Sequence, residues 1–249
     1  MLRVGRIIYD KKRQPVYPSF DGFTPILVMT YMYCPDYFPL SPYCLKDNKG
    51  RIMENIWQFS KCYETVPETK EYYPRSKTRV IWEHPAETHL DSNGDLTPEY
   101  LVWREKGMNC KDFIRYPVGF NHRSQCKFAL AENPCGSINK KRLNYIEGRK
   151  AIYLPVYCTL AKQQNRFKEL QDRLNKGENL LIIEVDGPHD ESLEYYKTKY
   201  DVGDDFIQNR TILINEKNIN IMLNDEKHPF GHGYCLAMAL MDKDIVWNQ

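Results

Sequence analysis

The most informative stretch of the chain reads Glu54-Asn55-Ile56-Trp57-Gln58-Phe59-Ser60-Lys61. We expect it to lie in a helix that begins near Met53 and ends before Pro67. The helical period brings four side chains, spaced by three or four positions, onto one stripe: Glu54, Trp57, Gln58 and Lys61. The opposite side carries apolar side chains typical of a core, namely Ile56, Phe59 and Tyr63.

This stripe combines a carboxylate, an indole, an amide and an amine, and we interpret it as the wall of a site for a polar ligand. The alternative is a surface stripe whose end charges, Glu54 and Lys61, are solvated, which is common on helix faces. Trp57 and Gln58 between the charges favour the ligand wall, because a solvated face rarely carries a Trp.

Length and composition set the broad class of the protein. A chain of 249 residues can form one large domain with an insert and has ample length for a buried core. The formal net charge of +2 gives no strong bias toward nucleic acid or membranes. No apolar run approaches a membrane span, and the first residues do not resemble a signal peptide. We therefore expect no membrane association and a cytoplasmic location.

The eight cysteines are scattered and form no C-x-x-C pair, so we expect reduced thiols that pack as small apolar side chains. His228, His232 and Cys235 have spacing that permits a metal site. Pro229 breaks the helix that would align both imidazoles, and no partner pair of cysteines exists. We expect no metal and no cofactor, and interpret each histidine as ligand-contacting or structural.

Apolar patterns along the chain predict a single α+β (or α/β) domain spanning 1–249. Expected strands cover 4–9, 24–33, 180–185 and 211–214, and expected helices cover 140–160, 165–175 and 231–241. Pro155 should interrupt the first of these helices, and Gly177 should close the second. The proline-rich stretch 66–140 is interpreted as an irregular insert, in which 80–82 and 100–103 form short strands or turns.

Five further positions are candidates for ligand binding or chemistry. Asp186 directly follows a buried strand, where α/β folds bind ligands, although it can equally cap an Asp-Gly turn. Gly231, with His228 and His232 beside it, precedes the last helix, whose first amides favour anions. Arg149 can hold a phosphate with two hydrogen bonds, or it can be part of a solvated basic pair.

Common catalytic signatures are missing from the sequence. It contains no G-x-S-x-G, Walker A, G-x-G-x-x-G or H-E-x-x-H motif. This argues against common serine hydrolases, P-loop NTPases, Rossmann dehydrogenases and zincins.

Three blocks of the sequence resemble the NADAR (YbiA-like) superfamily. The first is Pro39-Leu40-Ser41-Pro42-Tyr43, a turn, and then a helix similar to the family's E-x-x-Y-Q-x-x-K, with Trp57 in place of the tyrosine. The others are the acidic end of strand 180–186 and the final helix 231–241. Gly187-Pro188-His189 stands where the family has W-G, and the stretch 142–155 is also similar to uncharacterised phage proteins.

The resemblance implies binding of ADP-ribose-like or phosphoribosyl ligands and hydrolysis of an N-glycosidic bond. It implies chemistry by Glu54, Lys61 and Asp186, with Lys61 able to form a Schiff base at C1 of an opened ribose if burial lowers its pKa. Binding would then fall to the remaining candidates: Trp57, Gln58, Arg149, His228, Gly231 and His232. The expected partner is a small nucleotide or an ADP-ribosyl substrate.

Three other functions remain open from the sequence. One is a non-catalytic sensor of ADP-ribose or a nucleotide, and another is a structural interaction protein. The third is a base-modifying or glycosyl-transferring enzyme on nucleic acid, contacted through 66–120 and the basic side chains Lys70, Arg75, Lys77 and Arg79.

Overall fold

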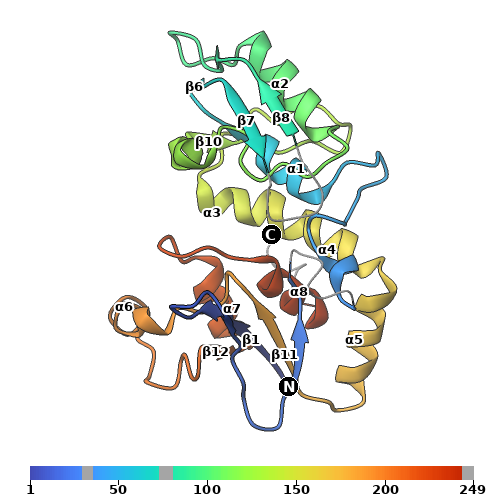
Figure 1. The fold of residues 1–249 in the computed structure, drawn as a ribbon, viewed down its shortest axis with the longest axis vertical. Helices are drawn as coiled ribbons and strands as arrows, with labels where there is room; N and C mark the ends of the chain where they lie inside the picture. Colours follow the sequence, from blue (N-terminus) through green and yellow to red (C-terminus); the bar gives the residue numbers. More distant parts are fainter. Residues whose placement is uncertain (30–35, 73–80, 243–249) are drawn as a thin grey trace. The chain divides into compact units, whose positions relative to one another are not determined.

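The computed structural model describes residues 1–29, 36–72 and 81–242 (Figure 1). It shows an α+β fold, as expected. Its internal contacts divide the chain into two compact units. The first unit comprises Met1–Cys44 and Leu154–Gln249, and the second unit comprises Leu45–Tyr153. Three of the four residues of the basic patch, Arg75, Lys77 and Arg79, lie outside the described residues.

A four-stranded mixed sheet forms the centre of the first unit (Figure 1). Its order is β12 (Thr211–Leu213), β1 (Leu2–Arg6), β11 (Leu180–Glu184), β4 (Thr24–Leu27). β1, β11 and β4 are parallel, and β12 runs antiparallel to β1. Every residue of β11 is buried. A central parallel strand is covered on both faces, which accounts for the continuous apolar run in its sequence.

Helix α8 (His232–Leu240) packs against β1 and β11, with α4 (Leu154–Lys162) and α5 (Asn165–Asn175) beside it. All of α8 is buried, so its sequence is apolar around the whole helix. The helix expected at 231–241 is therefore confirmed, and so is that at 165–175, which Gly177 closes with φ of 87°. Strand β11 ends at Glu184, one residue earlier than expected.

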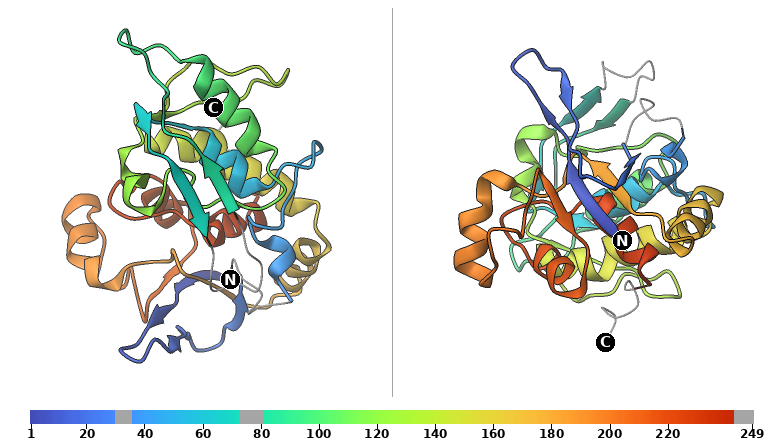
Figure 2. Two further views of the ribbon diagram at one scale, coloured as in Figure 1. Left: turned by 45° about the horizontal axis from the view of Figure 1, so that its top comes forward. Right: turned by 90° about the horizontal axis from the view of Figure 1, so that it is seen from below.

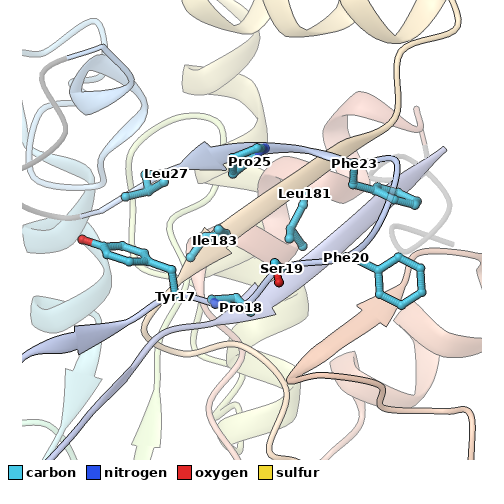
Figure 3. Close-up of a pocket in the computed structure, with 9 residues that line it drawn as sticks. All are labelled: Tyr17, Pro18, Ser19, Phe20, Phe23, Pro25, Leu27, Leu181 and Ile183. Carbon is cyan, nitrogen blue, oxygen red and sulfur yellow. The ribbon is translucent and has the colours of Figure 1, made fainter.

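On β11, the side chains of Leu181 and Ile183 pack with the aromatic segment around Phe20 and Phe23. A pocket of about 210 Å³ opens here (Figure 3). Its lining comprises Tyr17, Pro18, Ser19, Phe20, Phe23, Pro25, Leu27, Leu181 and Ile183. None of these described lining residues carries a carboxylate, amine or imidazole, so the pocket offers a mainly apolar surface whose polar side-chain groups are the hydroxyls of Tyr17 and Ser19.

The remaining elements of the first unit are short. β2 (Ile8–Tyr9) and β3 (Pro15–Val16) form a hairpin. The strand expected at 4–9 is therefore divided between β1 and β2. The strand expected at 24–33 ends at Leu27, and 30–33 lie outside the described residues. Helices α6 (Leu193–Tyr200) and α7 (Glu216–Leu223) were not expected from the sequence, and 3-10 turns cover Phe38–Leu40 and Asp190–Ser192.

In the second unit, α1 (Met53–Phe59) is shorter than expected. Lys61 lies on β5 (Lys61–Cys62), which pairs with β10 (Phe128–Ala129). The prediction that all four stripe residues share one helix is therefore wrong for Lys61. The helix ends before Lys61, because Lys61 pairs with Ala129 in the β5–β10 strand pair. This is a non-local contact that the helical period of the sequence does not reveal.

The stretch 66–140 contains more regular structure than expected (Figure 2). Its strands are β7 (Thr69–Tyr72), paired with β8 (Ile81–His84), and β9 (Glu87–Thr88), paired with β6 (Thr65–Val66). Residues 100–103 lie in helix α2 (Pro98–Met108), so their prediction as a strand or turn is wrong. Thr97 caps this helix by accepting from the Tyr100 amide, and Pro98 suits its first turn. A 3-10 turn covers Phe120–Gln125.

Aromatic side chains form the core of the second unit. The Phe59 ring lies 4.8 Å from that of Trp82 and 4.6 Å from that of Trp103, between centroids. Gly107 of α2 allows this approach, because a Cβ there would lie 2.1 Å from the Phe59 ring carbon Cδ1. Much of the aromatic content of the first half of the chain therefore serves packing.

The helical stretch predicted at 140–160 is confirmed from 145 onward, in interrupted form, and 140–144 are not helical. It comprises α3 (Tyr145–Gly148), a π-helical turn Arg149–Tyr153 and α4, which restarts one residue before Pro155. A wide π turn accommodates the proline, which lacks an amide hydrogen and crowds the preceding turn. Asn144 and Glu147 form a capping box at the start of α3.

No helix within the described residues is long and apolar enough to span a membrane.

Candidate functional site

The nine site residues expected from the sequence fall into two sets. The second unit holds Glu54, Trp57, Gln58, Lys61 and Arg149, and the first unit holds Asp186, His228, Gly231 and His232. Each set is described within its own unit.

Three polar side chains of the second unit form a hydrogen-bonded chain. Lys61 Nζ donates to Gln58 Oε1 over 2.9 Å, and Gln58 Nε2 donates to Glu54 Oε1 over 2.9 Å. Although Lys61 is not helical, it reaches the position that the stripe predicted. The amine and the carboxylate therefore lie on either side of a single amide.

Trp57 provides the apolar surface of this set. Lys61 Nζ lies 4.7 Å from the centre of the indole, within the range of a cation–π contact. The rings of Tyr153 and Tyr145 lie 5.3 Å and 6.5 Å from Trp57. Arg149 packs over the Tyr145 ring, with its Cζ 4.4 Å from the ring centre. We call these residues together the Lys61 cluster: Glu54, Trp57, Gln58, Lys61, Tyr145, Arg149 and Tyr153.

Burial distinguishes between the interpretations that the sequence left open. Glu54 is 7% exposed and Trp57 is 9% exposed, so the stripe is not a solvated helix face. Arg149 is 1% exposed, so it is not part of a solvated basic pair. Burying such groups costs free energy that a solvated surface does not require. The Lys61 cluster is therefore a partly buried polar site of the second unit, in which Gln58 and Lys61 are half-buried and Tyr145 is 51% exposed.

The surroundings of Lys61 change its acid–base behaviour. Burial lowers the pKa of its amine, while Cys126 and Glu54 act in the opposite direction with smaller effects. The pairing of β5 with β10 fixes the backbone of Lys61 opposite Ala129. A larger fraction of this amine is therefore neutral, and hence nucleophilic, near neutral pH than for an exposed lysine.

In the first unit, Asp186, Gly231 and His232 surround a residue that the sequence analysis missed, Glu184. Its side chain is 1% exposed. Glu184 Oε1 accepts from the Tyr234 amide at the start of α8, over 3.3 Å. Burial, and then the charge of Asp186, raise the pKa of Glu184 to about 8. The sequence signal that could have identified Glu184 is its position as a carboxylate at the end of an otherwise apolar strand.

Glu184 Oε2 lies 3.3 Å from His232 Nδ1, the spacing of an ion pair. His232 Nε2 lies 2.6 Å from the Val28 carbonyl oxygen, which can only accept, so Nε2 carries the proton. Burial also lowers the pKa of His232. Because both pKa shifts favour uncharged forms, we assign this pair as a neutral carboxyl beside a neutral imidazole.

The glycines before α8 make room for this carboxyl group. A Cβ on Gly231 would lie 2.2 Å from Glu184 Oε2, and one on Gly233 would lie 2.6 Å from Oε1. From the sequence we expected Gly231 to bring backbone close to a ligand. In the structure, the group that Gly231 approaches is Glu184. A ligand contact by Gly231 stays a prediction.

His228 belongs to a separate network. Its Nδ1 lies 2.6 Å from Asp225 Oδ2, and its Nε2 lies 3.0 Å from Ser192 Oγ. Tyr196 also donates to Asp225 Oδ2, over 2.6 Å. His228 and His232 therefore use their ring nitrogens in different networks. Asp225 lies three residues before His228, so its pairing had a local sequence signal, whereas Ser192 is distant in sequence from both and had none.

Comparison with models of protein families, with curated proteins and with solved structures found no match.

Proposed function

We propose that the Lys61 cluster is the active site of an N-glycosidase that cleaves the N-glycosidic bond of an ADP-ribosylated or phosphoribosylated substrate. The observation that carries the proposal is the half-buried Lys61 amine, hydrogen-bonded through Gln58 to Glu54 and packed on the Trp57 ring. The resemblance of this segment to the NADAR helix supports the same substrate class.

The lowered pKa of Lys61 is what covalent catalysis by an amine requires, because only the neutral form has a free electron pair. The amine attacks C1 of the ribose, a bond from Nζ to C1 forms, and the C1–N bond to the leaving group breaks. A leaving nitrogen that would depart as an anion takes the proton that the attacking amine loses, whereas the pyridinium nitrogen of NAD leaves as neutral nicotinamide and that proton stays on the enzyme until ring opening. Ring opening gives an imine, and water then releases the ribose and restores the amine.

Other members of the cluster have roles that follow from their chemistry. Glu54 lies across Gln58 from the amine, where a carboxylate can accept the proton that the amine loses and stabilise positive charge developing at C1. Trp57 offers a flat ring for a base or sugar. Gln58 can bond ribose hydroxyls, and Arg149 is suited to a phosphate.

The test uses ADP-ribose as the binding probe and NAD as the simplest N-linked ADP-ribosyl substrate. Excess ADP-ribose should raise the thermal midpoint of the wild-type protein by mass action. Release of the base from NAD or from a related N-glycoside should fall by roughly 10³-fold or more in Lys61→Arg, which keeps the charge but cannot form the imine.

Lys127→Ala is the matched control, because Lys127 adjoins the same strand pair but is half-exposed and pairs with Glu64. It should retain both the midpoint shift and the turnover. A midpoint shift without turnover of any N-glycoside would instead support the sensor alternative. No shift in the wild-type protein would contradict the proposal.

A further inference from the structure

Three side chains of the first unit are hydrogen-bonded in a line. Ser192 Oγ lies 3.0 Å from His228 Nε2, and His228 Nδ1 lies 2.6 Å from Asp225 Oδ2. This is the order of nucleophile, base and orienting carboxylate that acyl-transfer enzymes share on unrelated folds. We propose that Ser192, His228 and Asp225 form a second catalytic site, which hydrolyses esters of small acyl groups. This site is independent of the Lys61 cluster.

The hydrogen bonds to Asp225 determine which ring nitrogen of His228 carries the proton. Asp225 accepts from the hydroxyls of Tyr196 and Tyr195, over 2.6 and 2.9 Å, and from the Lys227 amide over 2.9 Å. Burial alone would raise the pKa of Asp225, but these donors and His228 hold it below its usual value. An ionised Asp225 can only accept, so His228 Nδ1 carries the proton and Nε2 is left to accept from Ser192.

Ser192 stands at the start of a helix. It is the last residue of the 3-10 turn Asp190–Ser192 and directly precedes Leu193, where α6 begins. The positive end of the helix dipole therefore lies at the serine and stabilises negative charge on the oxygen of the tetrahedral intermediate. Ser192 is 9% exposed, which restricts the site to small acyl groups.

The imidazole of His189 packs against that of His228. The rings of His189 and His228 lie 4.4 Å apart between centroids, at an angle of 32°. His189 Nδ1 lies 2.7 Å from both Arg6 Nη1 and Glu191 Oε1. Burial, and the nearby charge of Arg6, lower the pKa of His189. A neutral His189 does not repel the charge that His228 gains when it takes the serine proton.

The reaction follows from this arrangement. The Ser192 proton moves to His228 Nε2 while Oγ bonds to the carbonyl carbon of the ester. The bond from that carbon to the alcohol oxygen breaks, and the alcohol leaves with the proton from Nε2. Water then attacks the acyl-serine, gives its proton to Nε2, and releases the acid with the serine restored.

An alkyl fluorophosphonate tests this site, because serine displaces fluoride only when a base activates it. The wild-type protein should be labelled, and digestion should place the phosphonyl group on Ser192. Ser192→Ala should abolish labelling, whereas Ser19→Ala, at an exposed serine of the same unit, should not change it. Asp225→Asn should slow labelling by about 10²–10⁴-fold through the loss of His228 orientation.

The thermal midpoint of each variant shows whether it is folded, and Ser192→Ala, which removes one oxygen atom, is the decisive variant if Asp225→Asn unfolds. A wild-type protein that is not labelled, equal labelling of Ser192→Ala, or an adduct on a different residue would each overturn the proposal.

Discussion

The Lys61 cluster in the second unit and the Ser192 network in the first unit place the two proposed nucleophiles in contrasting surroundings. Lys61 is next to an indole and an amide, and burial itself lowers the pKa of its amine. Ser192 contacts an imidazole whose other nitrogen meets a carboxylate. An amine becomes nucleophilic by losing its charge, whereas a hydroxyl needs a base, so the same chain uses desolvation for one and hydrogen bonding for the other.

Each unit also contains a glutamate beside a histidine, and the glutamate is buried in the first unit and half-buried in the second. In the first unit Glu184 has a pKa of about 8, raised by burial. In the second unit Glu87 Oε1 lies 3.0 Å from His89 Nε2, and burial raises the pKa of Glu87 to about 7 and lowers that of His89 to about 4. Glu184, Glu87 and His89 are therefore mostly uncharged near pH 6, and burial shifts the pKa of His232 in the direction that favours its neutral form.

The largest expected effect is a pH dependence that separates these two pairs. The folded-state pKa of Glu184, about 8, lies above its ordinary value of 4.5, so the folded protein holds more protons between these values. Its contribution to stability is complete below pH 4.5 and is lost as the pH rises through 8, at up to about 1.4 kcal/mol for each pH unit.

Urea unfolding between pH 5 and 8 measures this slope. Glu184→Gln should flatten it across the whole range, because the amide does not titrate. Glu87→Gln should flatten it less and only up to about pH 7, because the pKa of Glu87 is raised less. An unchanged slope in Glu184→Gln would contradict the assignment of a neutral pair with His232.

A smaller effect compares two glycines, one beside the polar residues of each unit. In Gly231→Ala the new Cβ would lie 2.2 Å from Glu184 Oε2, and we expect a loss of about 1–3 kcal/mol in the free energy of unfolding. In Gly148→Ala the nearest atoms, on Ala129 and Trp57, lie 3.4 and 3.5 Å away. That change should be neutral or stabilise the helix by up to about 1 kcal/mol.

The double variant Gly231→Ala, Glu184→Ala provides the control for the first glycine. Removing the carboxyl group should recover part of the stability lost in Gly231→Ala, as judged by denaturant midpoints. Additive losses in the double variant would show that the glycine serves some other purpose than admitting Glu184.

The sequence predicted those parts of the fold and site that depend on local patterns. The apolar run of β11, the stripe of α5 with Gly177 at its end, and the spacing of Glu54, Trp57 and Gln58 are all short-range features. Helix α2 has a local start signal too, at Thr97 and Pro98, which the analysis overlooked.

Contacts between distant residues account for what could not be predicted. The strand position of Lys61 depends on Ala129, and the burial of Glu184 depends on α8. Ser192 reaches His228 only after the chain has passed through α6, β12 and α7. Hydrophobic periodicity describes the faces of single elements, so it does not specify which polar side chains meet across elements.

The central claim is that the Lys61 amine forms an imine with an opened ribose. Incubating the protein with ADP-ribose and sodium cyanoborohydride would reduce such an imine to a stable amine, and peptide mass spectrometry would locate it. We predict a ribosyl adduct on Lys61, formed faster than on the exposed Lys127 and missing from Lys61→Arg. Equal modification of Lys61 and Lys127, or no adduct on Lys61, would contradict the account.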